Sequence, residues 1–262
     1  MPTRRQEKTL RRSFFKKTRQ KQDFFAVEGE RALTELLKSD WNVLSIFATP
    51  PYVHKVRSLI PFESILEVEE LSPKKLAELT DTETPSGMLA LVEKKIYTIE
   101  QVAAEKRVLV LDNLRDPGNV GTLLRTAYAF GWNGVILLKG TAELFSPKVV
   151  RSTAGALFHL KIAEQVIPEE AVGMLKKHAF KIWAADSHSG ISPEECRRLI
   201  NPASAKNALV IGSEASGVSR TLLFNADGVV KISLSGEAES LNAAVSGGIL
   251  MYLLRSEAFS SI

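Results

Sequence analysis

The chain has 262 residues, of which 45% are hydrophobic and 24% charged, and its net charge at pH 7 is +4. This length suits one large domain or two modest ones, with enough apolar residues to bury a core. Four His and a single Cys, none at ligand spacing, exclude a recognisable zinc site, and the lone Cys196 excludes an internal disulfide. Free thiol chemistry fits a reducing compartment, so we expect a cytoplasmic location and no bound metal.

The sequence also lacks a recognisable membrane span. Its most apolar late segment, residues 241–254, contains Asn242 and Ser246 and is shorter than the roughly 20 residues that a bilayer requires. The N-terminus is basic but has no apolar stretch long enough for a signal peptide. We therefore expect no membrane partner.

Residues 1–21 form a basic arm with nine basic side chains and one acidic side chain, so the rest of the chain is net acidic. A dense basic segment suits a polyanion such as RNA, although a solvated, partly disordered tail has the same pattern. Phe14 and Phe15 within the arm indicate partial anchoring or base stacking. The residues we assign to RNA substrate binding are Arg11, Arg12, Lys16 and Lys17.

Residues 22–95 are expected to form a compact α/β unit, because strand-like and helix-like segments alternate along it. Ser72 and Pro73 have the pattern of an N-cap followed by proline in the first helical turn. The expected strands are 24–27, 43–48, 64–68 and 88–92, and the expected helices are 28–38, 53–59 and 72–79. Residues 96–106 are expected to be a linker to the next domain.

Residues 107–262 are expected to form a second α/β domain. Residues 108–111 are apolar at every position, as in a parallel strand that is covered on both faces. A bend at Pro117 and Gly118 leads into a helix over 120–130 that Gly131 closes. The further strands expected are 135–138, 182–185, 208–211 and 229–232, and the further helices are 146–157, 168–180, 196–200 and 240–257.

Three polar turns of this second domain lie at strand ends or helix starts. The first contains Asn119, the second Glu214, and the third Ser240 and Asn242. Ligands of α/β sheets bind at the carboxyl ends of strands, so three such turns indicate a site. Each also has a purely structural interpretation, because Asn and Ser cap helices and many strands end in glycine and an acid.

Arg125 lies in a helix that is apolar nearly all round, which predicts that the helix is buried. A buried guanidinium is costly unless it is paired with an anion. The partner is either a carboxylate in a structural pair or a phosphate of the substrate.

Three glycines near the polar turns predict close packing. Gly212 ends a strand where a ligand could approach the backbone closely. Gly247 and Gly248 each cost the last helix about 1 kcal/mol of propensity. That cost is easier to accept where another backbone packs closely, such as that of a second subunit.

No expected strand is followed by G-x-G-x-x-G, and no Walker-type loop occurs. These absences disfavour a nicotinamide enzyme and a nucleoside triphosphatase.

Taken together, the motifs resemble those of the SpoU (TrmH-like) family of RNA ribose 2′-O-methyltransferases in the SPOUT superfamily. An N-terminal segment also resembles the substrate-binding domain of that family, which has a ribosomal-protein-like α/β fold. The matching residues, in chain order, are Val27-Glu28-Gly29-Glu30-Arg31, Asn119-x5-Arg125 with Gly121, Gly212-Ser213-Glu214 with Gly217, and Ile232, Gly236 and Ser240-Leu241-Asn242. Departures from the family pattern are Ala215, where Gly is frequent, and Ser233 and Leu234, where Pro and Met are common.

The resemblance implies a C-terminal domain tied in a trefoil knot, a homodimer with sites at its interface, and S-adenosylmethionine bound in the knot. Arg125 would hold a phosphate and polarise the ribose hydroxyl, because a guanidinium is an awkward base. The other implied catalytic residues are Asn119, Glu214, Ser240 and Asn242, with Glu214 also a candidate partner for Arg125, and the implied cofactor-binding residues are Gly212, Ile232, Leu234 and Leu241.

The expected activity is methyl transfer from S-adenosylmethionine to a ribose 2′-hydroxyl in structured RNA, with ribosomal RNA favoured over transfer RNA. Three alternatives stay open. The chain could modify transfer RNA, it could be a non-catalytic RNA-binding or ribosome-assembly protein of the same fold, or it could be a small-molecule α/β enzyme that uses the same clefts.

Overall fold

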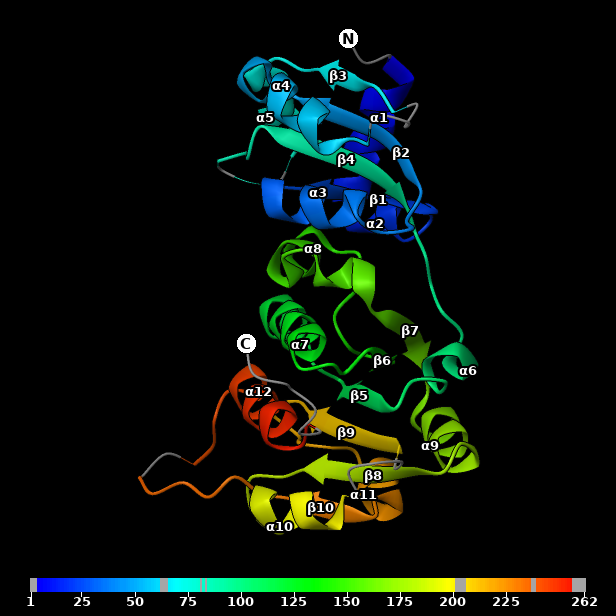
Figure 1. The fold of residues 1–262 in the computed structure, drawn as a ribbon, viewed down its shortest axis with the longest axis vertical. Coiled ribbons are helices and arrows are strands. Elements are labelled where there is room, and N and C mark those ends of the chain that lie inside the picture. Colours follow the sequence, from blue (N-terminus) through cyan, green and yellow to red (C-terminus); the bar gives the residue numbers. More distant parts are fainter. Residues whose placement is uncertain are drawn as a thin grey trace. The chain divides into compact units, whose positions relative to one another are not determined.

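The computed structural model describes residues 4–61, 66–80, 82, 84–200, 206–236 and 239–255. These residues form two compact units (Figure 1). The first unit contains the described residues up to Lys95 together with Glu143–His159, and the second contains Ile96–Ala142 and the described residues from Leu160 onward. The segment Glu143–His159, expected in the second domain, thus folds with the first unit.

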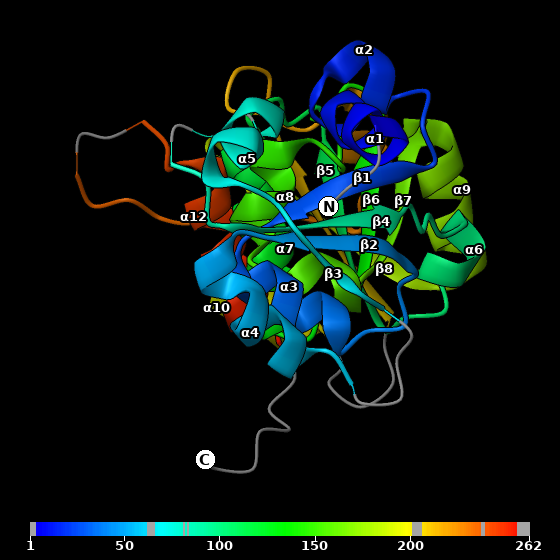
Figure 2. The same cartoon turned by 90° about the horizontal axis from the view of Figure 1, so that it is seen from above.

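The first unit is built on a four-stranded sheet in the order β1-β4-β2-β3, in which β4 is antiparallel to both of its neighbours and β3 is parallel to β2. Figure 2 shows α3 and α4 on one side of this sheet and α1 and α5 on the other. The strands are β1 (Phe24–Glu28), β2 (Val43–Ala48), β3 (Val68–Glu70) and β4 (Met88–Glu93). The helices are α1 (Arg4–Phe14), α2 (Lys16–Arg19), α3 (Glu30–Leu37), α4 (Pro50–Leu59), α5 (Pro73–Leu79), α8 (Pro147–Thr153) and the 3-10 helix η1 (Ala156–His159).

The basic arm folds as α1 and α2 of the first unit, so the interpretation of its described part as a disordered tail is wrong. Leu10 is fully buried in a cluster with residues of the sheet and of α5, and Phe14 packs against that cluster. Arg19 is 4% exposed and its guanidinium binds both carboxylate oxygens of Glu143, at 2.7 and 2.8 Å. The four residues assigned to RNA binding stay exposed on α1 and α2.

The second unit contains a six-stranded sheet in the order β10-β8-β9-β5-β6-β7, and every neighbouring pair in it is parallel. The expected α/β class is therefore confirmed. The strands are β5 (Arg107–Asp112), β6 (Gly134–Leu138), β7 (Lys161–Val166), β8 (Phe180–Ala185), β9 (Lys206–Gly212) and β10 (Gly228–Val230). The helices are α6 (Ile99–Val102), α7 (Pro117–Ala129), α9 (Pro168–Lys177), α10 (Pro193–Leu199), α11 (Arg220–Asn225) and α12 (Ala243–Leu253).

Three local features between residues 96 and 166 differ from the expectations. The helix expected over 146–157 ends at Thr153, because Ala154 and Gly155 adopt left-handed conformations with φ of 49° and 93°. The segment expected as a linker carries α6, which a capping box of Thr98 and Gln101 begins. Strand β7 had no clear apolar pattern and was not expected.

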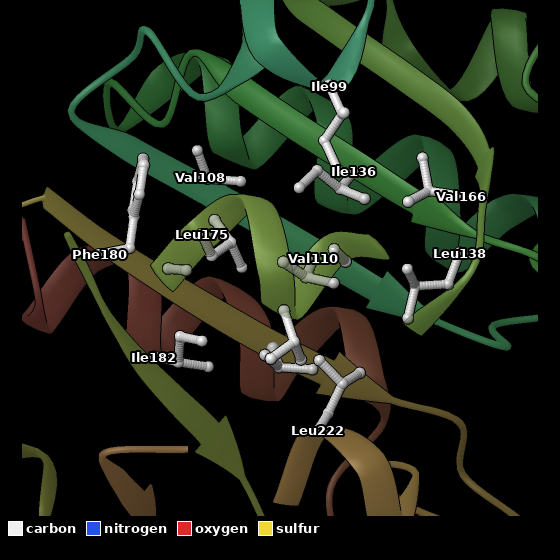
Figure 3. Packing of buried hydrophobic residues seen from close by; sticks show 14 of the residues in the cluster. Ile99, Val108, Val110, Ile136, Leu138, Val166, Leu175, Phe180, Ile182 and Leu222 are labelled. Carbon is white, nitrogen blue, oxygen red and sulfur yellow. The ribbon is translucent and has the colours of Figure 1, made fainter. Parts of the chain in front are cut away.

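A buried apolar cluster holds one face of the second sheet in place (Figure 3). Val108 and Val110 of β5 and Ile136 of β6 are completely buried in it, and Ile99 of α6 and Leu175 of α9 cover them. Each such side chain contributes roughly 1.5–3 kcal/mol through burial. This packing fixes the strand ends from which the polar turns emerge.

Candidate functional site

Polar side chains from the three turns meet in a hydrogen-bonded chain. Nδ2 of Asn119 donates to Oε1 of Glu214 at 2.5 Å, and Nδ2 of Asn242 donates to Oδ1 of Asn119 at 3.0 Å. Asn119 lies in the first turn of α7, Glu214 in the loop after β9, and Asn242 directly before α12. We call these three residues the polar triad.

The caps of two helices explain how the amides are oriented. Asp116, not Asn119, is the N-cap of α7, and its Oδ1 accepts from the backbone N of Asn119 at 2.8 Å. The capping interpretation of Asn119 is therefore wrong, and its amide is available to the rest of the triad. Asn242 does cap α12 through Oδ1, which accepts from the N of Ala244 and of Val245. Its Nδ2 remains to bind Asn119.

The loop after β9 is a tight turn that folds back on its own backbone. The N of Gly217 donates to the carbonyl oxygen of Ser213 at 2.8 Å, and Gly217 has a φ of +65°. A Cβ placed on Gly212 would lie 2.1 Å from the carbonyl carbon of Gly217. Glycine is thus required at 212 because of the loop itself, whereas the sequence suggested close approach of a ligand.

Asp112 ties the far end of this loop to the sheet. It is the last residue of β5 and is 5% exposed, and its Oδ2 accepts from the backbone N of Ser219 at 2.7 Å. Sequence reasoning missed this residue. The available signal was a carboxylate directly after four buried apolar residues of one strand.

A cavity of about 380 Å³ lies at the carboxyl ends of β8, β9 and β10. Its lining includes all four of the residues assigned to cofactor binding, together with Glu214 and Ser240 of the catalytic set; the four are Gly212, Ile232, Leu234 and Leu241. The lining also includes Asp186, Ser187 and His188, which follow β8 and which sequence reasoning did not nominate. Polar residues directly after the strand over 182–185 were the signal that could have identified them.

Arg125 does not lie in this cavity. The structure exposes its side chain, and among the described residues nothing forms a hydrogen bond or ion pair with it. The prediction that Arg125 is buried and the suggestion that it pairs with Glu214 are therefore wrong for the isolated chain. The helix α7 buries the side that carries Val120, Leu123, Leu124 and Ala127, while the apolar residues Tyr128 and Ala129 face outward.

Helices α7 and α12 together present an apolar outer surface. Val245 and Tyr252 of α12 are 50% and 47% exposed, and Tyr128 of α7 is 43% exposed. A groove of about 600 Å³ on this surface is lined by Val245, Ile249 and Tyr252, and it also touches two members of the polar triad, Asn119 and Asn242. The polar triad thus borders both the cavity and the apolar groove.

The two glycines of α12 differ in their surroundings. A Cβ on Gly247 would lie 2.4 Å from Cδ2 of Leu123 on α7, whereas a Cβ on Gly248 would be 3.6 Å from its nearest neighbour. Within the chain, the close neighbour of Gly247 is therefore a side chain of α7.

Other sites are not evident in the part of the chain that the structure describes. In those residues, no group of three or more His, Cys, Asp or Glu side chains could hold a metal ion. No described helix combines the length and hydropathy that crossing a membrane demands. Burial raises the pKa of Cys196 to about 12, so this thiol is unreactive at neutral pH.

Comparisons with known proteins match both units. The model of the SpoU rRNA Methylase family matches residues 106–252, and that of the MRM3-like substrate binding domain matches residues 6–90. The chain is 36% identical over 242 residues to 23S rRNA (guanosine(2553)-2′-O)-methyltransferase RlmP of Bacillus subtilis (strain 168), with 92% of each chain covered.

Solved structures agree with these matches. The AdoMet-bound rRNA methyltransferase from Sinorhizobium meliloti superposes with a TM-score of 0.85 at 27% identity, covering 99% of this chain and 97% of that one. A structure described as an RNA 2′-O ribose methyltransferase superposes with a TM-score of 0.75 at 25% identity, covering 96% of this chain and 95% of that one.

Proposed function

The chain belongs to the SpoU rRNA methylase family, and we propose that it transfers a methyl group from S-adenosylmethionine to a ribose 2′-hydroxyl of ribosomal RNA. The polar triad carries this proposal, because it joins all three family motifs at the mouth of a cavity. The similarity to a 23S rRNA 2′-O-methyltransferase over 92% of each chain favours ribosomal RNA over transfer RNA as the substrate.

The cavity fits the methyl donor. Its volume of about 380 Å³ lies within the roughly 300–1,000 Å³ of small-molecule sites. Ile232, Leu234 and Leu241 supply apolar contacts suited to an adenine ring, and the backbone of the loop from Gly212 supplies polar groups. S-adenosylmethionine would provide an electrophilic methyl group on its sulfonium. Of the residues that depart from the family pattern, Leu234 and Ala215 line this cavity, whereas Ser233 does not.

The polar triad would orient the ribose that is modified. Glu214 offers carboxylate oxygens that accept from sugar hydroxyls, while the Asn119 amide holds Glu214 and is itself held by Asn242. Ser240 adds a hydroxyl on the cavity wall. Such fixed groups accelerate a reaction chiefly by positioning, because the entropy cost of alignment is met during folding.

The exposure of Arg125 supports a site shared between two copies of this chain. Arg125 lies six residues after Asn119, so it projects about 120° away from it around α7 and not toward the same polar triad. The apolar surface of α7 and α12 beside it is unusual for a monomer, because α12 is apolar on nearly all sides. A second copy covering this surface would receive the guanidinium of Arg125 in its own site.

We assign the trefoil knot of the family to the second unit. Its support is that the cavity is lined by the chain after β8, after β9 and after β10, so three successive loops gather at one place. The last of these loops continues directly into α12, which packs against α7. Such a threaded end is rare, and it holds the loops together without a disulfide.

The first unit would dock the RNA. Arg11, Arg12, Lys16 and Lys17 lie exposed on a folded support, where they can contact phosphates without being ordered first. A cytoplasmic location, where such RNA and reduced thiols are found, stays a prediction.

Incubation of the purified protein with methyl-labelled S-adenosylmethionine tests the proposal against its alternatives. We expect label in ribosomal RNA, and mapping of 2′-O-methyl groups in cells with and without the protein would identify the nucleotide. Label in transfer RNA alone would identify transfer RNA, not ribosomal RNA, as the substrate. RNA binding without any transfer would favour a ribosome-assembly protein of the same fold.

A further inference from the structure

Asp186 is a carboxylate of the cavity wall that the methyl-transfer machinery above does not use. It is the residue directly after β8 and lines the same cavity as Gly212 and Leu241. Strand β9 separates β8 from β5, so the end of β8 lies about 10 Å across the sheet from the strand that leads to Asn119. Asp186 therefore lies on the side of the cavity away from the strand that leads to Asn119.

Of the two oxygens of this carboxylate, Oδ1 accepts hydrogen bonds within the fold, whereas Oδ2 is uncommitted among the described residues. Oδ1 accepts from the backbone N of His188 at 2.7 Å and of Ser189 at 2.9 Å, which fixes the side chain in one orientation. Among the described residues, no group forms a hydrogen bond with Oδ2. The arrangement presents a single, oriented acceptor to a ligand.

The charge state suits an acceptor. Burial acts to raise the pKa of the Asp186 carboxyl, but the two backbone N–H groups and the nearby charges of His188 and Lys231 outweigh it, so the pKa lies below its ordinary value. Lys231 itself donates to the carbonyl oxygen of His188 at 3.1 Å. Asp186 is thus ionised at neutral pH and can only accept hydrogen bonds.

We propose that Asp186 binds the ribose hydroxyls of the methyl donor through its uncommitted oxygen. This inference rests on the proposed function, since it names a contact within the same cofactor site. Val230 of β10 is paired with Ala185 in the sheet and also lines the cavity, so the surface next to Asp186 is apolar. An adenosine fits this combination of an acceptor and an apolar surface. Its ribose hydroxyls can donate to Asp186, and the base attached to the same sugar can contact the apolar surface. The α-ammonium group of the methionine part is the competing donor.

Binding of two ligands to Asp186→Asn separates these donors. S-adenosylhomocysteine carries both the diol and the ammonium, whereas methylthioadenosine keeps the diol and lacks the amino acid. Asn retains an oxygen for the N–H groups of His188 and Ser189, so the turn is preserved, but it replaces the free acceptor by a donor. We expect calorimetric titration to give affinities about 10- to 100-fold weaker for both ligands.

Ser189→Ala is the matched control, because Ser189 lies in the same turn, is absent from the cavity lining, and keeps its backbone N–H for Oδ1 of Asp186. It should bind both ligands as the wild type does. An Asp186→Asn variant that binds methylthioadenosine normally would overturn the inference, and a loss confined to S-adenosylhomocysteine would assign the carboxylate to the ammonium instead. A wild-type protein that binds neither ligand would overturn the proposed function itself.

Discussion

The side-chain amide of Asn242 donates to the side chain of Asn119 at 3.0 Å, although the two residues are 123 positions apart in the sequence. The same Asn242 begins α12 by accepting from two backbone N–H groups. One side chain thus sets both the start of the last helix and the orientation of the polar triad. These two tasks use different atoms, so they can be separated by substitution.

Asn242→Asp should lose activity and keep stability. Aspartate caps helices as well as asparagine does, so the free energy of unfolding, measured by thermal denaturation, should change by no more than about 0.5 kcal/mol. The donor to Asn119 is lost, however, and a negative charge is added near Glu214, so methyl transfer should fall about 100-fold. Asn242→Ala, which removes the cap as well, should cost about 1 kcal/mol of stability in addition. Wild-type turnover by the aspartate variant would contradict the role given to the triad.

The sequence could predict that the three turns meet, because parallel strands end on one edge of a sheet. It could not predict which side chains of these turns form hydrogen bonds with one another. Asp116 caps α7 by accepting from the backbone N of Asn119, so the side-chain amide of Asn119 is not used as the cap. Asp186 was missed because a strand followed by an acid is common, and only the loop geometry leaves its second oxygen without a hydrogen-bond partner among the described residues.

Mixing two inactive variants tests whether the site is shared between subunits. Arg125→Ala and Asn242→Asp should each be inactive as homodimers. If Arg125 acts in the partner's site, each mixed dimer contains one intact site, so an equal mixture should recover about a quarter of wild-type turnover. No recovery after subunit exchange, verified by tagged copies, would mean that Arg125 acts within its own subunit.

Arg125→Lys isolates the contribution of the guanidinium. Lysine keeps the charge but loses the planar fork that holds a phosphate through two hydrogen bonds. Turnover should fall strongly, while titration with S-adenosylhomocysteine should give a nearly unchanged affinity, because Arg125 is absent from the cavity lining. Retained turnover would reject the assignment of Arg125 to the reaction.

The two glycines of α12 form a matched pair for testing the packing of this helix. Gly247→Ala would force a methyl group to 2.4 Å from Leu123, and overpacking of this kind costs about 1–3 kcal/mol. In Gly248→Ala the added methyl group would make an ordinary contact, 3.6 Å from Cγ2 of Thr126, and the variant should gain up to about 1 kcal/mol of helix propensity. Urea unfolding at one protein concentration measures the change in the free energy of unfolding for both variants. A Gly248→Ala protein that dissociates more readily would show that a second copy packs against that position.

The basic arm is anchored in the first unit, as its phenylalanines indicated. The charge run alone is equally compatible with a solvated tail, but Leu10 and Phe14 recur on one side of α1 and pack into the core. Arg19 is buried because Glu143, more than 120 positions away, neutralises it. A pairing over that separation cannot be read from local pattern. The arm and the segment Glu143–His159 are therefore parts of one folded unit.

This structure also changes how RNA binding by the arm should be tested, because deleting residues 1–21 would remove Leu10 and Arg19 and so damage the fold. Replacing the four exposed residues of the arm by glutamine removes charge and leaves the core intact; they are Arg11, Arg12, Lys16 and Lys17. If each contacts one phosphate, the slope of log affinity against log salt should flatten by roughly 3. Replacing Lys38 and Lys55, exposed lysines of the same unit that pair with Glu35 and Glu30, should leave the slope unchanged. Equal slopes for the fourfold variant and the wild type would assign RNA contact to another surface.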